Sequence, residues 1–136
     1  MVTKNKIKEL NRTEKQIRKE IRKLTNNELV SEYEKTVTGA TAFVGSLKGG
    51  VNQISNWTGD KDLLVHYLAY ATAAGTYHFT KKCIQEGKIK ELRVKIDARH
   101  YVNVSVGEIF ADAVRRLVIL EEYVRRKLYL KQNAEK

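Results

Sequence analysis

Apolar residues recur at alternating steps of three and four from Ser105 to about Gln132, and this spacing predicts a long amphipathic helix. Ser105 and Glu108 have the spacing of a capping box, in which each side chain accepts a hydrogen bond from the other residue's amide. The apolar stripe, which we expect in the core, consists of Val106, Phe110, Ala113, Leu117, Leu120, Val124 and Leu128. A second face is expected to carry the cations Arg115, Arg116, Arg125, Arg126 and Lys127.

Residues 3–24 have a much narrower apolar seam, which Glu14 alone interrupts. Glu14 and Arg18 are four residues apart, and this spacing predicts an ion pair along one face of a helix. A helix with so thin a seam is marginal on its own in water. We therefore expect an arm that becomes ordered on a partner or a polyanion, and a remaining bundle that folds without it. The seam, no wider than a coiled-coil stripe, consists of Ile7, Leu10, Ile17, Ile21 and Leu24.

Two segments divide the chain after this helix. Residues 25–28, Thr-Asn-Asn-Glu, form a second capping box, which ends the first helix and begins another. Residues 45–59 are rich in glycine, asparagine and serine, and they predict a loop. The glycines and the lysine of this loop suggest a phosphate-binding loop, but the Gly-Lys-Ser/Thr motif that such a loop requires is missing.

Residues 60–88 predict the longest helix, with Gly87 placed to end it. Residues 71–75 are small on nearly every face, so we expect them to contact the last helix closely and Ala74→Leu to overpack that contact. Residues 89–104 leave two interpretations, a short hairpin or a helical turn followed by an extended connector. The whole pattern predicts an all-α fold, with a helix-turn-helix arm over residues 1–45, a glycine-rich loop over 46–59 and a small antiparallel helical bundle over 60–136.

The 136 residues carry a formal net charge of +10, and the excess is uneven. Residues 1–24 hold nine lysines and arginines against three glutamates, and residues 61–136 hold fifteen basic residues against nine acidic ones, so each segment has a net charge of +6. The natural partner is a polyanion, and the alternative is a basic surface that only keeps the protein soluble. The residues expected to bind nucleic acid are Lys4, Lys8, Arg12, Lys15, Arg18, Lys19, Arg22, Lys23, Lys90, Arg93, Lys95 and Arg99.

The residues that commonly perform catalysis do not form a recognisable motif. Of the three histidines, His66 and His78 have no cysteine or carboxylate at a convincing metal-binding spacing, and Arg99-His100 has no second acid or base at the spacing of a catalytic motif. Cys83 has no second cysteine to pair with. We therefore expect neither an enzyme nor a cofactor or metal. No apolar run approaches the length of about 20 residues that a membrane span needs. The expected location is intracellular, in the cytoplasm or in a virion.

A basic helix-turn-helix arm that leads into a small bundle resembles the coat proteins of filamentous and rod-shaped archaeal viruses. The resemblance lies in the layout of the whole chain, namely the cationic arm over residues 4–23, the turn over residues 25–28 and the bundle helices. It implies a structural protein whose helices wrap double-stranded DNA, held in the A-form inside a helical virion, with a homodimer or heterodimer as the unit. Double-stranded DNA is therefore the favoured partner, and RNA is left open.

Two alternatives share the basic, helical character of this chain. The chain is similar in size, charge and helicity to the small subunits of multi-subunit CRISPR effectors, which line a nucleic-acid channel inside a larger ribonucleoprotein. A helix-turn-helix regulator would need base-reading side chains at the start of its recognition helix. Asn26, Asn27 and Glu28 are the only candidates there, and a helix cap explains them better.

Overall fold

The computed structural model describes residues 3–46, 61–87, 89–95 and 97–128. Within these ranges the chain forms four helices and a two-stranded sheet, which confirms the prediction of an essentially all-α small helical bundle. The elements are α1 (Thr3–Arg22), α2 (Asn26–Ser46), α4 (Lys61–Glu86), β1 (Glu91–Lys95), β2 (Tyr101–Ser105) and α5 (Val106–Arg125). The predicted glycine-rich loop over residues 46–59 lies outside the described residues, apart from Ser46 at the end of α2.

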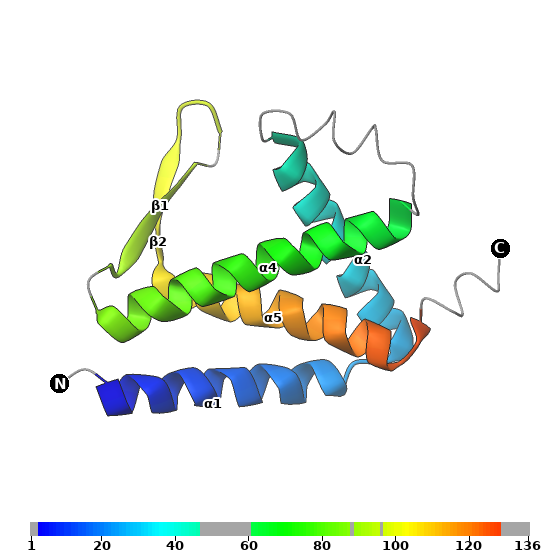
Figure 1. Cartoon of the computed structure of the whole chain (residues 1–136), viewed down its shortest axis with the longest axis horizontal. Helices are drawn as coiled ribbons and strands as arrows, with labels where there is room; N and C mark the ends of the chain where they lie inside the picture. Colours follow the sequence, from blue (N-terminus) through cyan, green and yellow to red (C-terminus); the bar gives the residue numbers. More distant parts are fainter. Residues whose placement is uncertain (1–2, 47–60, 88, 96, 129–136) are drawn as a thin grey trace.

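Helix α5 lies between α1 and α4 in a row of three long helices (Figure 1). Helix α4 runs antiparallel to α5, as the sequence predicted, whereas α1 runs in the same direction as α5. Helix α2 crosses the row, and the β1–β2 hairpin projects from the row on the side of α4, away from α1 (Figure 1). This arrangement makes α5 the central helix of the bundle.

The main core cluster joins α5 to three other helices, and α1 is one of them. Leu10 and Ile21 of α1, exposed to 6% and 1%, share this cluster with Leu29 of α2 and with Phe110 and Ile119 of α5. The expectation that α1 is an arm independent of the bundle is therefore not met, because its thin seam fills part of the common core. The seam is narrow since only one side of α1 meets other helices.

The two predicted capping boxes have different outcomes. Between Thr25 and Glu28 the box is confirmed, with the Glu28 amide donating to Thr25 Oγ1 at 3.2 Å and the Thr25 amide donating to the Glu28 carboxylate at 2.9 Å. This contact lowers the pKa of Glu28, chiefly through the backbone hydrogen bond. The box at Ser105 is wrong, because Ser105 is the N-cap residue but its side chain makes no cap hydrogen bond. Ser105 is instead the last residue of β2, paired with Glu91.

Helix α5 is shorter than predicted and is buried over a wider face. It ends at Arg125 rather than near Gln132, and Lys127 has a positive φ of 57°, in the left-handed region that terminates helices. Val124, which the stripe placed in the core, is 45% exposed. The buried positions that the stripe omitted are Val114, Val118, Ile119, Glu122 and Tyr123.

Helix α4 is turned relative to the prediction. Ala69, Ala73 and Thr80 are buried, whereas Ala71 and Gly75 are exposed and Ala74 is half-buried. The contact predicted for residues 71–75 is therefore wrong for Ala71 and Gly75, the two exposed members of that segment. The sequence misled because α4 is apolar on nearly every side, so its pattern does not single out one inner face. The predicted helix end is confirmed, since Gly87 has a φ of 71° and its amide donates to the Cys83 carbonyl at 3.0 Å.

Residues 89–104 form a hairpin, the first of the two interpretations. Strands β1 and β2 are antiparallel, with Leu92 opposite Val104 and Lys95 opposite Tyr101. The connection is closed by Asp97, whose carboxylate accepts from the amides of Arg99 at 2.9 Å and His100 at 3.1 Å. The pKa of Asp97 is lowered, mostly by the hydrogen bond from the Arg99 amide and next by the contact with the His100 side chain.

Candidate nucleic-acid interface

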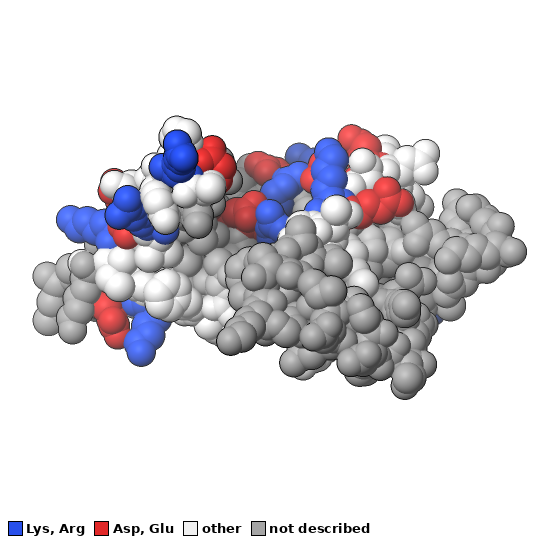
Figure 2. Space-filling view, turned by 90° about the horizontal axis from the view of Figure 1, so that it is seen from above, with Lys and Arg blue, Asp and Glu red and all other residues white. Residues whose placement is uncertain are grey.

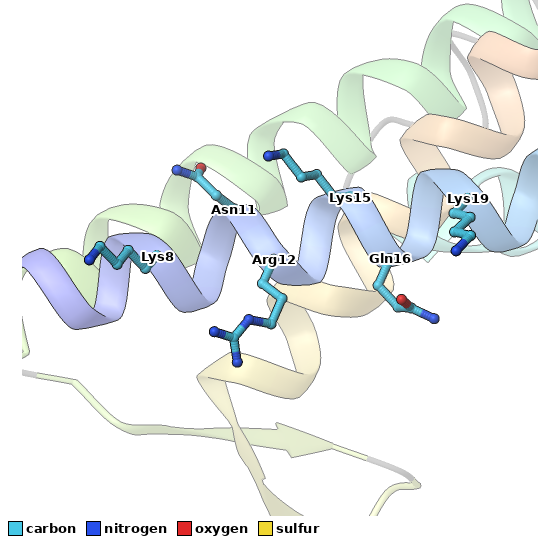
Figure 3. A pocket seen from close by; sticks show the side chains of 6 residues that line it. All are labelled: Lys8, Asn11, Arg12, Lys15, Gln16 and Lys19. Carbon is cyan, nitrogen blue, oxygen red and sulfur yellow. The ribbon is translucent and has the colours of Figure 1, made fainter.

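The outer face of α1 carries a line of cations along the helix. Lys8, Arg12, Lys15 and Lys19 follow one another at steps of four, three and four residues, and all four are exposed. Steps of this kind keep side chains on one face of an α-helix, here the face opposite Leu10 and Ile21. Figure 3 shows these side chains, with Asn11 and Gln16 beside them, standing out from α1. Arg22, the last residue of α1, and Lys23, directly after it, are also exposed and extend the line. We call Lys8, Arg12, Lys15, Lys19, Arg22 and Lys23 the α1 stripe.

None of the six side chains in the α1 stripe forms an ion pair with an acidic residue in the described part of the chain. Two of the three glutamates of α1 have other partners. Glu20 accepts a hydrogen bond from Gln16 at 3.1 Å, and Glu14 accepts one from the Tyr77 hydroxyl of α4 at 2.5 Å. Burial, and then the hydrogen bond to Glu14, raise the pKa of Tyr77. Glu14, the one polar residue in the apolar seam, therefore joins α1 to α4 through this hydrogen bond.

The geometry of the α1 stripe concentrates positive charge. From Lys8 to Arg22 the helix rises about 21 Å, at about 1.5 Å per residue. Neighbouring members from Lys8 to Arg22 are therefore separated along the axis by about 4.5–6 Å, well within the Debye length of about 10 Å at 0.1 M salt. Their potentials add together, and they repel one another. A row of anions along α1 would relieve that repulsion, so the stripe is suited to a linear polyanion.

Two of the residues predicted for nucleic-acid binding in α1 are not part of the stripe. Arg18 donates to the Glu121 carboxylate of α5 at 3.0 Å, so the predicted pair with Glu14 is wrong. This pair spans α1 and α5 and fixes their relative position at the surface. Lys4 lies within α1, but its side chain falls outside the described residues.

The hairpin cations form a separate and weaker group. The guanidinium of Arg93 lies over the Tyr101 ring, 4.2 Å from its centroid, and Lys90 and Arg99 are exposed. The side chain of Lys95 falls outside the described residues. Glu91 and Asp97 lie among these cations, and Figure 2 shows basic and acidic side chains mixed on this side of the molecule. Since α5 and α4 lie between α1 and the hairpin, the two predicted groups do not form one surface (Figure 1).

The arginines of α5 are engaged in ion pairs within the molecule. Arg115 contacts Glu32 of α2 at 3.4 Å, and Arg116 contacts Asp112 at 2.8 Å. Arg125 pairs with Glu122, a carboxylate that is only 4% exposed. The second face of α5 therefore presents much less free positive charge than the sequence suggested.

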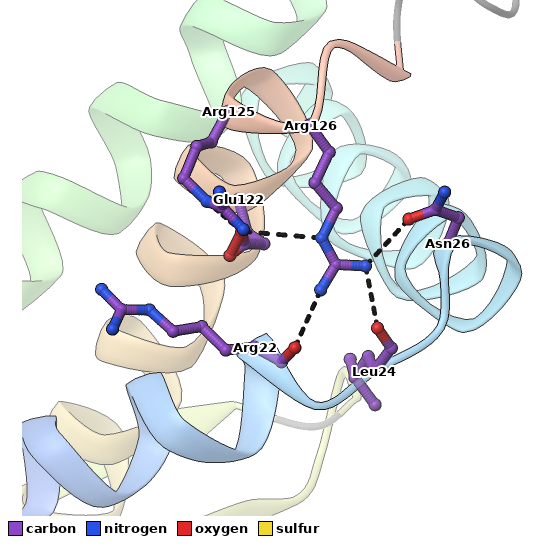
Figure 4. A network of polar contacts seen from close by, with 6 residues as sticks. All are labelled: Arg22, Leu24, Asn26, Glu122, Arg125 and Arg126. Atoms are coloured by element: carbon purple, nitrogen blue, oxygen red, sulfur yellow. Dashed lines mark hydrogen bonds and ion pairs between the residues drawn. The ribbon is translucent and has the colours of Figure 1, made fainter.

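Arg126 has a role that the sequence analysis missed. Its guanidinium donates to the carbonyl oxygens of Leu24 at 2.8 Å and Arg22 at 3.1 Å, and to the Asn26 side chain at 3.0 Å (Figure 4). Its Nε lies 3.5 Å from Glu122. Arg126 thereby satisfies carbonyls at the end of α1 that have no partner within the helix. The one sequence signal was the spacing of four between Glu122 and Arg126, which marks a helical ion pair but not its contact with α1.

Other reactive side chains do not gather into a site. His66 Nδ1 lies 2.9 Å from the Tyr33 hydroxyl, and burial lowers the pKa of His66. Cys83 is buried and forms no disulfide. Histidine, cysteine and carboxylate side chains in the described ranges form no group of three or more that could hold a metal ion. Over the same ranges, no helix has the length and apolar character needed to cross a membrane.

Comparison of the chain with protein-family models, with curated proteins and with solved structures yields no significant match. The geometry of the α1 stripe is therefore the main guide to function.

Proposed function

We propose that this protein is a non-catalytic structural protein that coats and packages a nucleic acid. The observation that carries the proposal is the α1 stripe, five exposed cations on one face of α1 and Lys23 directly after it, with no ion pair to an acid among the described residues. Lysine and arginine in a row contact phosphates, and such contacts position a protein on nucleic acid without reading its sequence. Many copies, each bound by its stripe, would cover a duplex.

The start of α2 supports phosphate binding over sequence-specific recognition. Asn26 accepts a hydrogen bond from Arg126, and Glu28 is engaged with Thr25. Two of the three base-reading candidates of a helix-turn-helix regulator are thus already used inside the fold. The α1 stripe instead offers a row of cations along one helix, which suits contact with successive phosphates of a backbone.

Measurement of the salt dependence of DNA binding tests the proposal. If all six side chains of the α1 stripe contact phosphates of a B-form duplex, log Kd against log salt should have a slope near 5, because each neutralised phosphate contributes about 0.9. In the double variant Lys15→Gln, Lys19→Gln the slope should fall by about 1.8. The matched control, Arg93→Gln with Arg99→Gln on the hairpin, should retain most of the wild-type slope. If the hairpin pair reduces the slope and the α1 pair does not, α1 is not the interface.

Sequence preference and particle shape separate the remaining candidates. A coat protein should bind unrelated duplexes alike, and a preference of about 1000-fold for one sequence, the size typical of specific binders, would favour a regulator. Negative-stain microscopy of the protein with long duplex DNA should show regular filaments. Discrete particles that form only with other subunits present would favour a small subunit of a ribonucleoprotein.

A further inference from the structure

The outer face of α4 is exposed and uncharged over most of its length. From Leu63 to Phe79 the sequence contains no lysine, arginine, aspartate or glutamate, in a chain that is 31% charged. Tyr67 is 66% exposed and Phe79 51% exposed, and Ala71 and Gly75 between them are exposed as well. A Cβ atom added at Gly75 would meet no atom of another part of the fold within 4 Å. This face is not part of the α1 stripe, and the core described above does not use it.

These four residues form a single ridge. Tyr67, Ala71, Gly75 and Phe79 are spaced by four, which is the row that packs most often when two helices cross. The ridge is large at both ends and small in the middle. If a second α4 lies across it, related by a twofold axis near residue 73, the small residues of both helices meet at the crossing. Each Tyr67 then faces the Phe79 of the other copy, so the ridge is complementary to itself.

We infer that a second copy of this chain docks on the α4 ridge, defined as Tyr67, Ala71, Gly75 and Phe79. The distribution of charge is the first argument for a second copy as the partner on this ridge. Two copies that each carry a net charge of +10 repel one another through most of their surfaces, but an uncharged ridge brings no like charges into contact. The sequence of large and small residues also matches its own reverse, which an isologous twofold interface requires. This inference specifies the assembly step of the proposed coat and rests on that function.

The area of the ridge indicates a weak dimer. A tyrosine or phenylalanine buries about 150–250 Å² when fully covered, and the rings of Tyr67 and Phe79 have about half to two-thirds of their surface available. The two rings thus supply roughly 200 Å² per copy, whereas a standard interface buries about 800 Å² per partner. Dimers should therefore be sparse in dilute solution. Copies held side by side on a nucleic acid reach effective concentrations of the order of millimolar, at which a weak contact is occupied.

Sedimentation equilibrium of the full chain without nucleic acid tests the inference. Association should appear at protein concentrations up to about 1 mM and should become stronger as salt rises from about 0.1 to 0.5 M, because salt screens the repulsion between copies. This direction is opposite to that expected for DNA binding, which weakens with salt. Dimerisation that weakens with salt, or a chain that is monomeric throughout this range, would overturn the inference.

Gly75→Arg is the diagnostic variant, and Ser31→Arg on the exposed side of α2 is its control with the same added charge. The open space around Gly75 lets the variant fold, which circular dichroism would verify. We expect Gly75→Arg to weaken dimerisation at least tenfold and to make DNA binding less cooperative, with the salt slope per bound copy retained. Ser31→Arg should dimerise like the wild type. Equal dimerisation by the two variants would contradict the inference, whereas loss of DNA binding in the wild type would contradict only the proposed function.

Discussion

The guanidinium of Arg126 donates a hydrogen bond to the carbonyl of Leu24 at 2.8 Å, joining the chain beyond α5 to the end of the helix that carries the α1 stripe. The same group also serves the Arg22 carbonyl and the buried Glu122 (Figure 4). Arg126→Met should lower the free energy of unfolding by about 2–4 kcal/mol, because carbonyls lose their donor and Glu122 loses one of two cations. Urea denaturation followed by circular dichroism measures this change.

Arg125→Met is the matched control for that prediction. Arg125 contacts the same Glu122, but its side chain is 66% exposed and its pairing is confined to α5. Its loss should lower the unfolding free energy by no more than about 1 kcal/mol. If the two variants are equally destabilised, the bonds from Arg126 to the end of α1 contribute little.

The contribution of α1 to the core gives a second prediction, which reverses the expectation from the sequence alone. Ile21 is 1% exposed and packs in the cluster that contains Phe110 and Ile119, so Ile21→Ala should cost about 2–5 kcal/mol. Lys19→Ala, two residues away on the exposed face, should change stability by less than about 0.5 kcal/mol. Deletion of residues 3–24 should leave a chain without a cooperative unfolding transition. A truncated chain that still unfolds cooperatively would show that α1 is dispensable for folding.

The sequence predicted several features that depend on local chemistry, although the local capping box at Ser105 and the local pair of Glu14 with Arg18 were wrong. Helix positions, the Thr25–Glu28 cap and the stop at Gly87 follow from residues a few positions apart, whose preferences act within one turn. The α1 cations were also predicted, because their spacing is a local pattern.

Partners far apart in the chain could not be predicted from one sequence. The contact of Arg18 with Glu121 spans 103 residues, and nothing near Arg18 distinguishes it from its neighbours in the stripe. The inner face of α4 was misplaced for a related reason. When a helix is apolar all round, the helices that pack against it decide which side is buried.

Gly75 gives a third prediction, on the stability of the monomer. Glycine within a helix is less favourable than alanine by roughly 0.5–1 kcal/mol, and a methyl group at Gly75 would meet no atom within 4 Å. Gly75→Ala should therefore raise the unfolding free energy by about that amount, measured in dilute protein so that dimerisation does not contribute. At Gly39 the added carbon would lie 3.3 Å from Arg116, so Gly39→Ala should gain less. If Gly39→Ala raises the unfolding free energy as much as Gly75→Ala does, the Arg116 side chain moves aside without cost.

The last prediction concerns the pH dependence of stability at His66. His66 lies on α4 and is half-buried, with its ring stacked on that of Tyr33 at a centroid distance of 5.8 Å. This burial disfavours the charged imidazolium and lowers the pKa of His66 below its ordinary value of 6.5. Below that value the unfolded chain therefore binds more protons at this residue than the folded chain does. The stabilisation due to neutral His66 is complete above pH 6.5, declines as the pH falls through the interval between the two pKa values, and is lost below the folded pKa.

Denaturation curves across this interval, with His66→Gln as the test variant and His78→Gln as the control, measure this dependence. His66→Gln should flatten the decline just below pH 6.5, because glutamine does not titrate. His78 is exposed, and its variant should follow the wild-type curve. If His66→Gln leaves the decline unchanged, the half-buried imidazole of His66 is not its source.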